Sequence, residues 1–194
     1  MANVAIVGSG FIGRAWAISF ARAGHEVRMW DQSPAATSGA RDYIEGVLGD
    51  LAANDLLRGQ SVDTVLGRIA MVAELAEALA DAAHVQENTP ENLDVKREVF
   101  SLIDRLAGPQ TVIASSTSAL LPSKFTDHLP ERHRCLVVHP INPPYLIPAA
   151  EVVPAPWTSA ETVARTRDFL LSAGHAPIVM KRELDGFVMN RLQG

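Results

Sequence analysis

Asn-Val-Ala-Ile-Val-Gly-Ser-Gly-Phe-Ile-Gly, residues 3–13, is the stretch that decides the fold. Its first half, residues 3–7, is an apolar run that predicts a buried parallel strand. Three glycines follow, and apolar residues at 12, 16, 20 and 23 then recur at near-helical spacing. A G-x-G-x-x-G loop between a strand and a helix is the context in which this motif binds a dinucleotide. The sequence therefore predicts a βα unit that opens a nucleotide-binding domain.

Each position of the glycine loop has a distinct physical task in such a unit. Gly8 permits the tight turn, Gly10 lets a pyrophosphate approach the backbone, and Gly13 lets the helix pack close to the strand. The backbone amides near Phe11 and Ile12 are expected to face the anion at the positive end of the helix.

An acidic residue follows the second predicted strand, residues 26–30. Asp31 lies 18 residues after Gly13, where a carboxylate accepts hydrogen bonds from the adenosine ribose and repels a 2′-phosphate. The sequence therefore favours NAD over NADP as cofactor. A glycine-rich turn with a capping aspartate is the alternative, but strand, glycines, helix and acid all agree with the dinucleotide site.

The rest of the chain alternates short apolar runs with helical patterns. This alternation predicts an α/β fold, a doubly wound Rossmann-type sheet that is mostly parallel, with a helical insertion after the second strand. Further strands are expected at residues 68–71, 83–86, 111–114, 135–138, 151–153 and 177–179. Helices are expected at residues 35–57, along an apolar stripe of Val95, Val99, Leu102, Ile103 and Leu106, and from the N-cap Ser159 to about Ser172.

Composition excludes several classes of function. The 194 residues are 47% hydrophobic and 20% charged, an ordinary globular mixture. A net charge of −5 without a basic stripe argues against nucleic acid as a partner. No run of 18 apolar residues predicts a membrane span, and no His, Cys, Asp or Glu group has metal-ligand spacing. Cys135, the single cysteine, lies in an apolar run and is expected to be a buried inert thiol; with no secretory leader, we expect a cytoplasmic protein.

The second half of the chain carries a set of polar motifs at strand ends. Ser115-Ser116-Thr117-Ser118 follows one strand, His139-Pro-Ile-Asn-Pro-Pro-Tyr145 follows another, Glu151 comes 12 residues after His139, and Asp185-Gly-Phe-Val-Met-Asn-Arg191 closes the chain. Over its whole length the chain resembles the 3-hydroxyacyl-CoA dehydrogenase superfamily. The stretch 116–124 and the doubled proline after Asn142 are similar to its lambda-crystallin branch, the L-gulonate 3-dehydrogenases.

The resemblance implies catalytic roles for four residues. His139 matches the family's catalytic histidine and Glu151 its partner carboxylate, whereas Ser118 and Asn190 match the serine and asparagine that hold the reacting oxygen. Alcohol oxidation needs a base near neutral pH, a carboxylate behind it, and polar groups for the developing alkoxide. The resemblance also implies that Glu87, Asn92 and Asn142 line the NAD site.

Ordinary structural roles compete with these assignments. The remaining histidines, at 25, 84, 128, 133 and 175, are expected to be surface or satisfied core residues. Glu151 alone would be a strand-start carboxylate, and Asn190 alone a polar helix residue. A Ser-His-Glu hydrolase is conceivable on composition, but the chain has no G-x-S-x-G elbow.

The helix after the second strand bears on the substrate. The acyl-CoA branch contacts CoA there with a serine and a lysine, and a gap-free count places these positions at Val47 and Asn54. Residues 33–68 contain no lysine and more acidic than basic residues, which suits CoA phosphates poorly. A small free hydroxy acid such as L-gulonate is therefore preferred as substrate, with Lys124 and Arg191 as candidate carboxylate anchors by position.

Two alternatives stay open at this stage. One is a 3-hydroxyacyl-CoA dehydrogenase, for instance of 3-hydroxybutyryl-CoA. The other is a catalytically silent NAD-binding or structural protein of the crystallin kind, against which the presence of Ser118, His139, Glu151 and Asn190 argues.

The resemblance also predicts the domain organisation. Residues 1–183 are expected to form the NAD-binding domain, and 184–194 to begin an all-helical domain that closes the cleft and makes a homodimer in a full-length form. The chain is then expected to bind NAD but to turn over poorly by itself.

Overall fold

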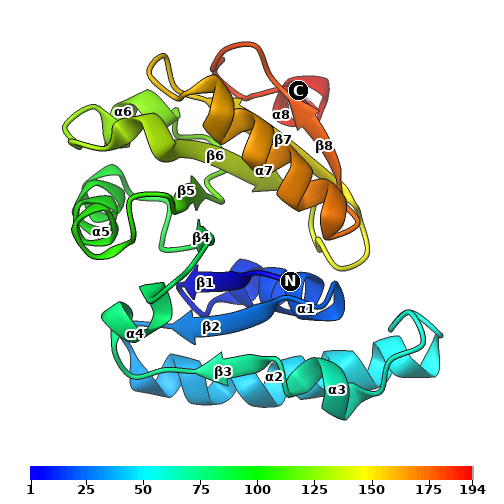
Figure 1. Ribbon diagram of the computed structural model, residues 1–194. Helices are drawn as coiled ribbons and strands as arrows, with labels where there is room; N and C mark the ends of the chain where they lie inside the picture. The colour runs from blue at the N-terminus through cyan, green and yellow to red at the C-terminus, as the bar shows by residue number, and fades with distance from the viewer. Residues whose placement is uncertain (194) are drawn as a thin grey trace.

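The computed structural model describes residues 1–193 and has an α/β fold built on one mixed sheet (Figure 1). Its eight described strands lie in the order β3-β2-β1-β4-β5-β6-β7-β8, from the bottom to the top of the view. The strands are β1 (Asn3–Val7), β2 (Glu26–Trp30), β3 (Ile69–Met71), β4 (His84–Glu87), β5 (Val112–Ser115), β6 (Cys135–Pro140), β7 (Ala149–Pro154) and β8 (Ala176–Val179). This arrangement confirms the predicted Rossmann-type sheet.

Helices connect most of the strands. The helices are α1 (Phe11–Arg22), α2 (Pro34–Ala53), α3 (Val62–Leu66), α4 (Leu75–Leu79), α5 (Leu93–Leu106), α6 (Pro122–Thr126), α7 (Ala160–Ser172) and α8 (Met189–Gln193), with a 3-10 turn at Arg132–Arg134. Of these described helices, none combines the length and the apolar character that a bilayer crossing requires.

The pairing of the strands explains where a site can form. Strands β1 to β6 are all parallel, so their carboxyl ends meet at one edge of the sheet. Strand β7 runs antiparallel to β6, because the proline-rich loop after Pro140 turns the chain back without a crossover helix. In this register His139 lies directly opposite Glu151.

Two apolar cores cover the two faces of the sheet. Alternate residues of β1 belong to different cores, as the period of a strand requires: Val4 and Ile6 face one core, Ala5 and Val7 the other. The first core contains residues of α1, α2, α3 and α7, and the second contains residues of α4, α5 and α6. The sheet is therefore covered by helices on both faces.

The predicted elements differ from the structure at helix boundaries and in the short helices α3, α4 and α6, which the sequence patterns do not predict. The helix expected over residues 35–57 ends at Ala53, and Asp55 and Arg58 then adopt positive φ values of 58° and 55°. The apolar face of this helix, with Ile44, Leu48 and Leu51, is buried as predicted. Ser159 caps α7 by accepting a hydrogen bond from the Thr162 amide at 3.0 Å, also as predicted.

Candidate functional site

The glycine loop between β1 and α1 is shaped by close backbone contacts. Gly8 has φ of +93°, and a Cβ there would lie 2.9 Å from the backbone of Asn88. A Cβ at Gly13 would collide with the carbonyl oxygen of Gly8. At Gly10, by contrast, a Cβ would meet no described atom within 4 Å. Two glycines therefore let the loop fold, whereas the third leaves open space at the start of α1.

Asp31, directly after β2, contacts the same loop. Its Oδ2 accepts hydrogen bonds from the Ser9 amide at 2.7 Å and the Ser9 hydroxyl at 2.9 Å, and Oδ1 accepts from the Ser33 amide at 2.9 Å. Phe11 is 54% exposed at the first position of α1. The predicted cofactor residues of the first βα unit are thus brought together.

A cavity of about 250 Å³ lies beside this loop, at the carboxyl ends of the parallel strands. The loops after β4, β5 and β6 supply most of its wall, and Ile12 of α1 closes it. Four of the predicted site residues line it: Ile12, Ser118, His139 and Asn142. The carboxyl edge is where a doubly wound sheet binds its ligands.

His139 and Glu151 form a buried pair at this cavity. His139 Nδ1 lies 2.7 Å from Glu151 Oε2, and the carboxylate is fully buried. The other carboxylate oxygen, Oε1, accepts hydrogen bonds from the amides of Val188 at 2.6 Å and Met189 at 3.0 Å. Glu151 is therefore fixed on one side by the segment that opens α8 and on the other by the imidazole.

Ser118 and Asn190 also lie together. The Asn190 side-chain amide donates a hydrogen bond to the Ser118 carbonyl oxygen at 2.7 Å. Asn190 is exposed on α8, and Ser118 lines the cavity. The four residues expected to carry catalysis are thus connected pairwise, His139 with Glu151 and Ser118 with Asn190.

Glu87 and Asn92, the other two expected cofactor residues, do not line the cavity. Both carboxylate oxygens of Glu87 lie 3.0 Å from Lys96 Nζ, and the pair is almost fully buried. Glu87 also accepts hydrogen bonds from the Ser115 hydroxyl at 2.6 Å and the Thr89 amide at 2.6 Å. Asn92 caps α5 by accepting from the Val95 amide at 3.1 Å.

Their near neighbours Glu91 and Lys96 line the cavity instead. Glu91 Oε1 accepts hydrogen bonds from the Thr117 hydroxyl and, at 3.3 Å, from the amide of Leu120, so it fixes the loop after β5. Sequence reasoning missed both residues. The signal for Lys96 was its spacing to Phe100 and Ile103, which places a lysine on the buried face of α5.

The floor of the cavity is a polar network that sequence reasoning also missed. The Ser116 hydroxyl accepts hydrogen bonds from Trp16 Nε1 at 3.0 Å and Gln86 Nε2 at 2.7 Å, and it donates to Asn88 Oδ1 at 2.7 Å. Gln86 and Trp16 are fully buried. The network ties α1, β4 and the loop after β5 to one another.

The other histidines and Cys135 lie outside the candidate site, in the core or at the surface. His128 and His133 lie at the surface, and His25, His84 and His175 are buried. His25 departs from the expected satisfied core residue, because neither of its ring nitrogens forms a hydrogen bond with a described residue. Cys135 is buried, and its burial raises the pKa of the thiol, which makes it unreactive. Within residues 1–193, no group of three His, Cys, Asp or Glu residues is placed to hold a metal ion.

Comparison with known proteins places this chain in a dehydrogenase family. The family model described as 3-hydroxyacyl-CoA dehydrogenase, NAD binding domain, matches residues 3–183. Rabbit (Oryctolagus cuniculus) lambda-crystallin is 43% identical over 98% of this chain and 60% of its own length. An L-carnitine dehydrogenase of Streptomyces coelicolor is 40% identical over 98% of this chain and 59% of its own.

A solved structure has the same fold. The 3-hydroxybutyryl-CoA dehydrogenase from Escherichia coli K12 superposes with a TM-score of 0.93 at 30% identity, over 98% of this chain and 40% of that one. The chain spans about 60% of the length of the lambda-crystallins that it matches.

Proposed function

Because this chain belongs to the 3-hydroxyacyl-CoA dehydrogenase family, we propose that it is the NAD-binding part of an oxidoreductase that oxidises the 3-hydroxyl of a small hydroxy acid. The observation that carries the proposal is the His139–Glu151 pair, 2.7 Å apart, at a cavity beside a dinucleotide-type glycine loop.

His139 is the proposed general base. A carboxylate only accepts hydrogen bonds, so the imidazole Nδ1 carries the proton in this pair, and in the neutral ring Nε2 has a free lone pair. Nε2 can then take the proton of a substrate hydroxyl. Glu151 holds the ring in this tautomer and stabilises the imidazolium that forms. Since Glu151 is fully buried and has two amide donors besides, its position does not depend on water.

Ser118 and Asn190 are proposed to hold the reacting oxygen. Of the groups in the described chain, none hydrogen-bonds the Ser118 hydroxyl, which leaves it free to donate to a developing alkoxide. Asn190 is anchored through Nδ2 to the Ser118 backbone. Its position therefore depends on how α8 sits against the loop after β5.

The residues of the first βα unit fit a dinucleotide. Open space in front of Gly10 gives a pyrophosphate access to the free amides of the first turn of α1. Gly8, Gly13, Phe11 and Ile12 shape this approach, and Asp31 is placed to accept from a ribose, which favours NAD over NADP. When bound, NAD supplies the acceptor for the hydride that leaves the substrate carbon.

The cavity wall adds further residues toward the cofactor. Asn142 lines the cavity, as the family resemblance implies, and Glu91 and Lys96 line it from the other side. Glu87 supports this wall from behind through its ion pair with Lys96. Asn92 acts as the cap of α5, one residue after Glu91.

The substrate is proposed to be a free hydroxy acid rather than an acyl-CoA. Helix α2, where the acyl-CoA branch contacts CoA, has Val47 at one contact position and carries Asp42, Glu45 and Asp50 against the single Arg41. Such a surface repels CoA phosphates. The alternative, a 3-hydroxyacyl-CoA substrate, is favoured by the name of the E. coli structural relative.

The domain boundary is proposed at residue 183. The family match ends there, and α8 follows with Asn190 as the only proposed catalytic residue beyond the boundary. Residues 184–194 would belong to a helical domain that closes the cleft and pairs in a homodimer; Gly194 lies outside the described residues.

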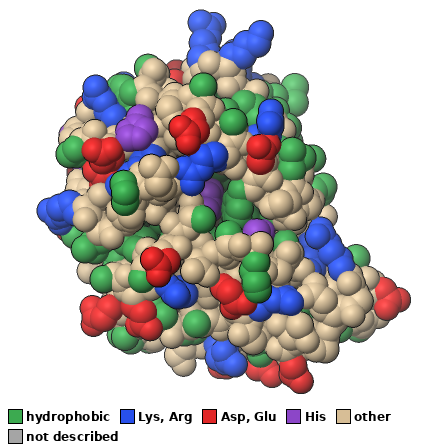
Figure 2. All heavy atoms as spheres, in the orientation of Figure 1, with side chains coloured by type: hydrophobic (Ala, Val, Ile, Leu, Met, Phe, Trp, Pro, Cys, Tyr) green, Lys and Arg blue, Asp and Glu red, His purple; other side chains and the backbone are tan. Residues whose placement is uncertain are grey.

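The proposed partner of the protein is a small hydroxy acid, its substrate, and the proposed location is the cytoplasm. On the face shown in Figure 2, acidic and basic side chains of the described residues are interspersed, a pattern unlike a nucleic-acid surface.

The experiment that tests this function is NADH formation with 3-hydroxy acids and 3-hydroxyacyl-CoAs, using a protein that contains this chain and the remaining length of its relatives. We expect turnover of free hydroxy acids, and loss of at least about a hundredfold in kcat for His139→Gln, because the base is removed. NAD affinity is expected to be unchanged. The exposed His133→Gln is the matched control. Retained activity in His139→Gln, or turnover of acyl-CoAs alone, would contradict the proposal.

A further inference from the structure

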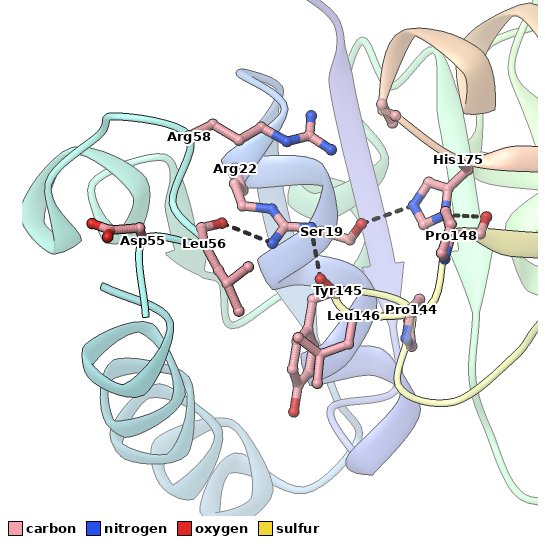
Figure 3. A pocket seen from close by; sticks show the side chains of 12 residues that line it. Ser19, Arg22, Asp55, Leu56, Arg58, Pro144, Tyr145, Leu146, Pro148 and His175 are labelled. Atoms are coloured by element: carbon pink, nitrogen blue, oxygen red, sulfur yellow. Dashed lines mark hydrogen bonds between the residues drawn. The ribbon is translucent and has the colours of Figure 1, made fainter. Parts of the chain in front are cut away.

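A second cavity, of about 320 Å³, is lined in part by the loop that follows β6 (Figure 3). The end of α1, the segment after α2, the β6–β7 loop and the turn before β8 surround it. None of the described residues lines both this cavity and the candidate site. It is therefore a separate feature of the molecule.

Arg22, the last residue of α1, forms the floor of this cavity and is only 8% exposed. Its two terminal nitrogens donate hydrogen bonds to the carbonyl oxygens of Leu56 at 3.0 Å and Tyr145 at 2.7 Å. Its Nε is buried, and no described group accepts a hydrogen bond from it. A buried N–H of a charged group that no group of the chain accepts is costly.

A second guanidinium faces the first. Arg58 lies over Gly174, where a Cβ would collide with its guanidinium, and it forms no hydrogen bond or ion pair with the described residues. Burial lowers the pKa of Arg22, and the charge of Arg58 lowers it further. Asp55 is the carboxylate of the cavity wall, but its side chain points away from both arginines, beyond Leu56 (Figure 3).

The opposite wall is polar but uncharged. His175 Nδ1 donates a hydrogen bond to the carbonyl oxygen of Pro148 at 3.1 Å, because a carbonyl oxygen can only accept. In the neutral ring Nε2 then carries no proton, so it accepts a hydrogen bond from the Ser19 hydroxyl at 2.8 Å. Burial lowers the pKa of His175 to about 4, so the ring is neutral near pH 7. Two positive charges thus lie in one cavity, and the one carboxylate that the described residues contribute to its wall, that of Asp55, points away from both (Figure 3).

We infer that this cavity binds a phosphate group, held by the exposed guanidinium of Arg58 next to the buried positive charge of Arg22. Guanidinium groups match phosphate oxygens in geometry, and a dianion offsets two like charges that otherwise repel each other. The volume is near the lower end of ligand pockets, about 300 Å³, and Pro144 and Leu146 add apolar wall. The group can therefore belong to inorganic phosphate or to a small phosphate ester.

The test is an NMR titration that follows the Arg22 Nε–Hε resonance of the nitrogen-15-labelled chain. Inorganic phosphate and phenyl phosphate are the two probes, and a saturable shift of this resonance is the expected result. A lower Kd for phenyl phosphate would assign the site to an ester, and an equal or higher one would assign it to the free ion. Backbone amides of residues 11–13 report separately on any binding at the start of α1.

The decisive variant is Arg58→Gln, because Arg58 is exposed and its loss leaves the contacts of Arg22 intact. We expect its Kd for phosphate to rise about tenfold, as the loss of a charged hydrogen bond predicts. Arg105→Gln removes the charge of another exposed arginine, on α5, and should leave the Kd unchanged. An Arg22 resonance that does not move with either probe, or equal Kd values in the two variants, would overturn the inference.

Discussion

At position 10 the fold itself does not require glycine, but a bound ligand would. Its backbone angles, φ −66° and ψ −173°, are allowed for any L-residue, and its Cβ position is open. The neighbouring Gly8 and Gly13 are restricted by the fold itself, since their Cβ atoms would meet backbone. A requirement for glycine at position 10 would therefore come from a ligand.

Replacing Gly10 with alanine is expected to separate binding from stability. The free energy of unfolding should stay the same or rise by about 0.5 kcal/mol, because alanine has less freedom in the unfolded chain. NAD affinity should fall at least about tenfold, since the methyl group occupies the approach to the first turn of α1. Calorimetric titration and urea unfolding measure the two quantities.

Gly39→Ala is the matched control, because Gly39 is exposed on α2 and its Cβ would also meet nothing. It should leave NAD binding unchanged. The same titration of the parent with NADP should show weaker binding than NAD, as Asp31 beside the loop predicts. Equal NAD affinity in Gly10→Ala and the parent would remove the glycine loop from the cofactor site.

At the scale of elements, helix α5 shows that an apolar stripe locates a buried face only in part: Ile103 lies in the core, and Val99 and Leu102 pack against it. The apolar stripe of Val95, Val99, Leu102, Ile103 and Leu106 predicts the buried side, but Leu106 is 50% exposed. The fully buried face instead runs through Lys96, Phe100 and Ile103. The ion pair with Glu87 is what makes a buried lysine acceptable there.

Removing the charge of Lys96 should destabilise the whole fold. In Lys96→Met the carboxylate of Glu87 stays buried without its cation, which costs about 3–5 kcal/mol in comparable pairs. The free energy of unfolding, from urea denaturation, is the measurement. The double variant Glu87→Gln with Lys96→Met should recover a large part of the loss, because no buried charge remains.

Lys124→Met is the control for this experiment, since Lys124 is exposed on α6 and should change stability by no more than about 0.5 kcal/mol. A single variant as stable as the parent, or a double variant no better than the single one, would show that the pair does not carry this stability.

The accuracy of the sequence predictions depends on how local the determining interactions are. The unit β1-α1-β2 follows from periodicity and glycine spacing, both local, and its bounds agree with the structure. The short helices α3, α4 and α6 were not predicted, because five residues carry too little periodicity. The family resemblance, drawn from motifs at strand ends, is confirmed by the match over residues 3–183.

The site residues likewise fall into those that sequence motifs identify and those that depend on contacts between distant segments. His139 and Glu151 could be paired in advance by motif, and the register of β6 and β7 places them opposite each other. The roles of Glu91, Lys96 and Gln86 depend on contacts between distant segments, for example Glu91 with Thr117. Local spacing places Lys96 on the buried face of α5, but it does not identify the distant partners of these residues, which only the fold reveals.

At the scale of the whole molecule, three buried histidines surround Phe20 and Phe169 between α1, α7 and the sheet. His84 stacks on Phe169 with ring centroids 4.5 Å apart, and His25 packs against the same ring at 5.0 Å. Burial lowers the pKa of His84 to about 4, and burial likewise lowers that of His175 to about 4. These histidines act as neutral core residues, and protonation should open the core.

Stability should therefore fall as the pH is lowered from about 6.5 to about 4. Over this interval His84 and His175 are protonated in the unfolded chain but remain neutral in the folded one. Each of the two histidines therefore lowers the free energy of unfolding by about 1.4 kcal/mol for every pH unit by which the pH falls. In His84→Phe the new ring keeps the packing on Phe169. The slope of the free energy of unfolding against pH should then decrease by the amount that corresponds to one proton taken up on unfolding. Urea unfolding in phosphate-free buffers measures this slope, and the exposed His133→Gln should match the parent. Equal slopes in His84→Phe and the parent would mean that His84 is not held neutral by the fold.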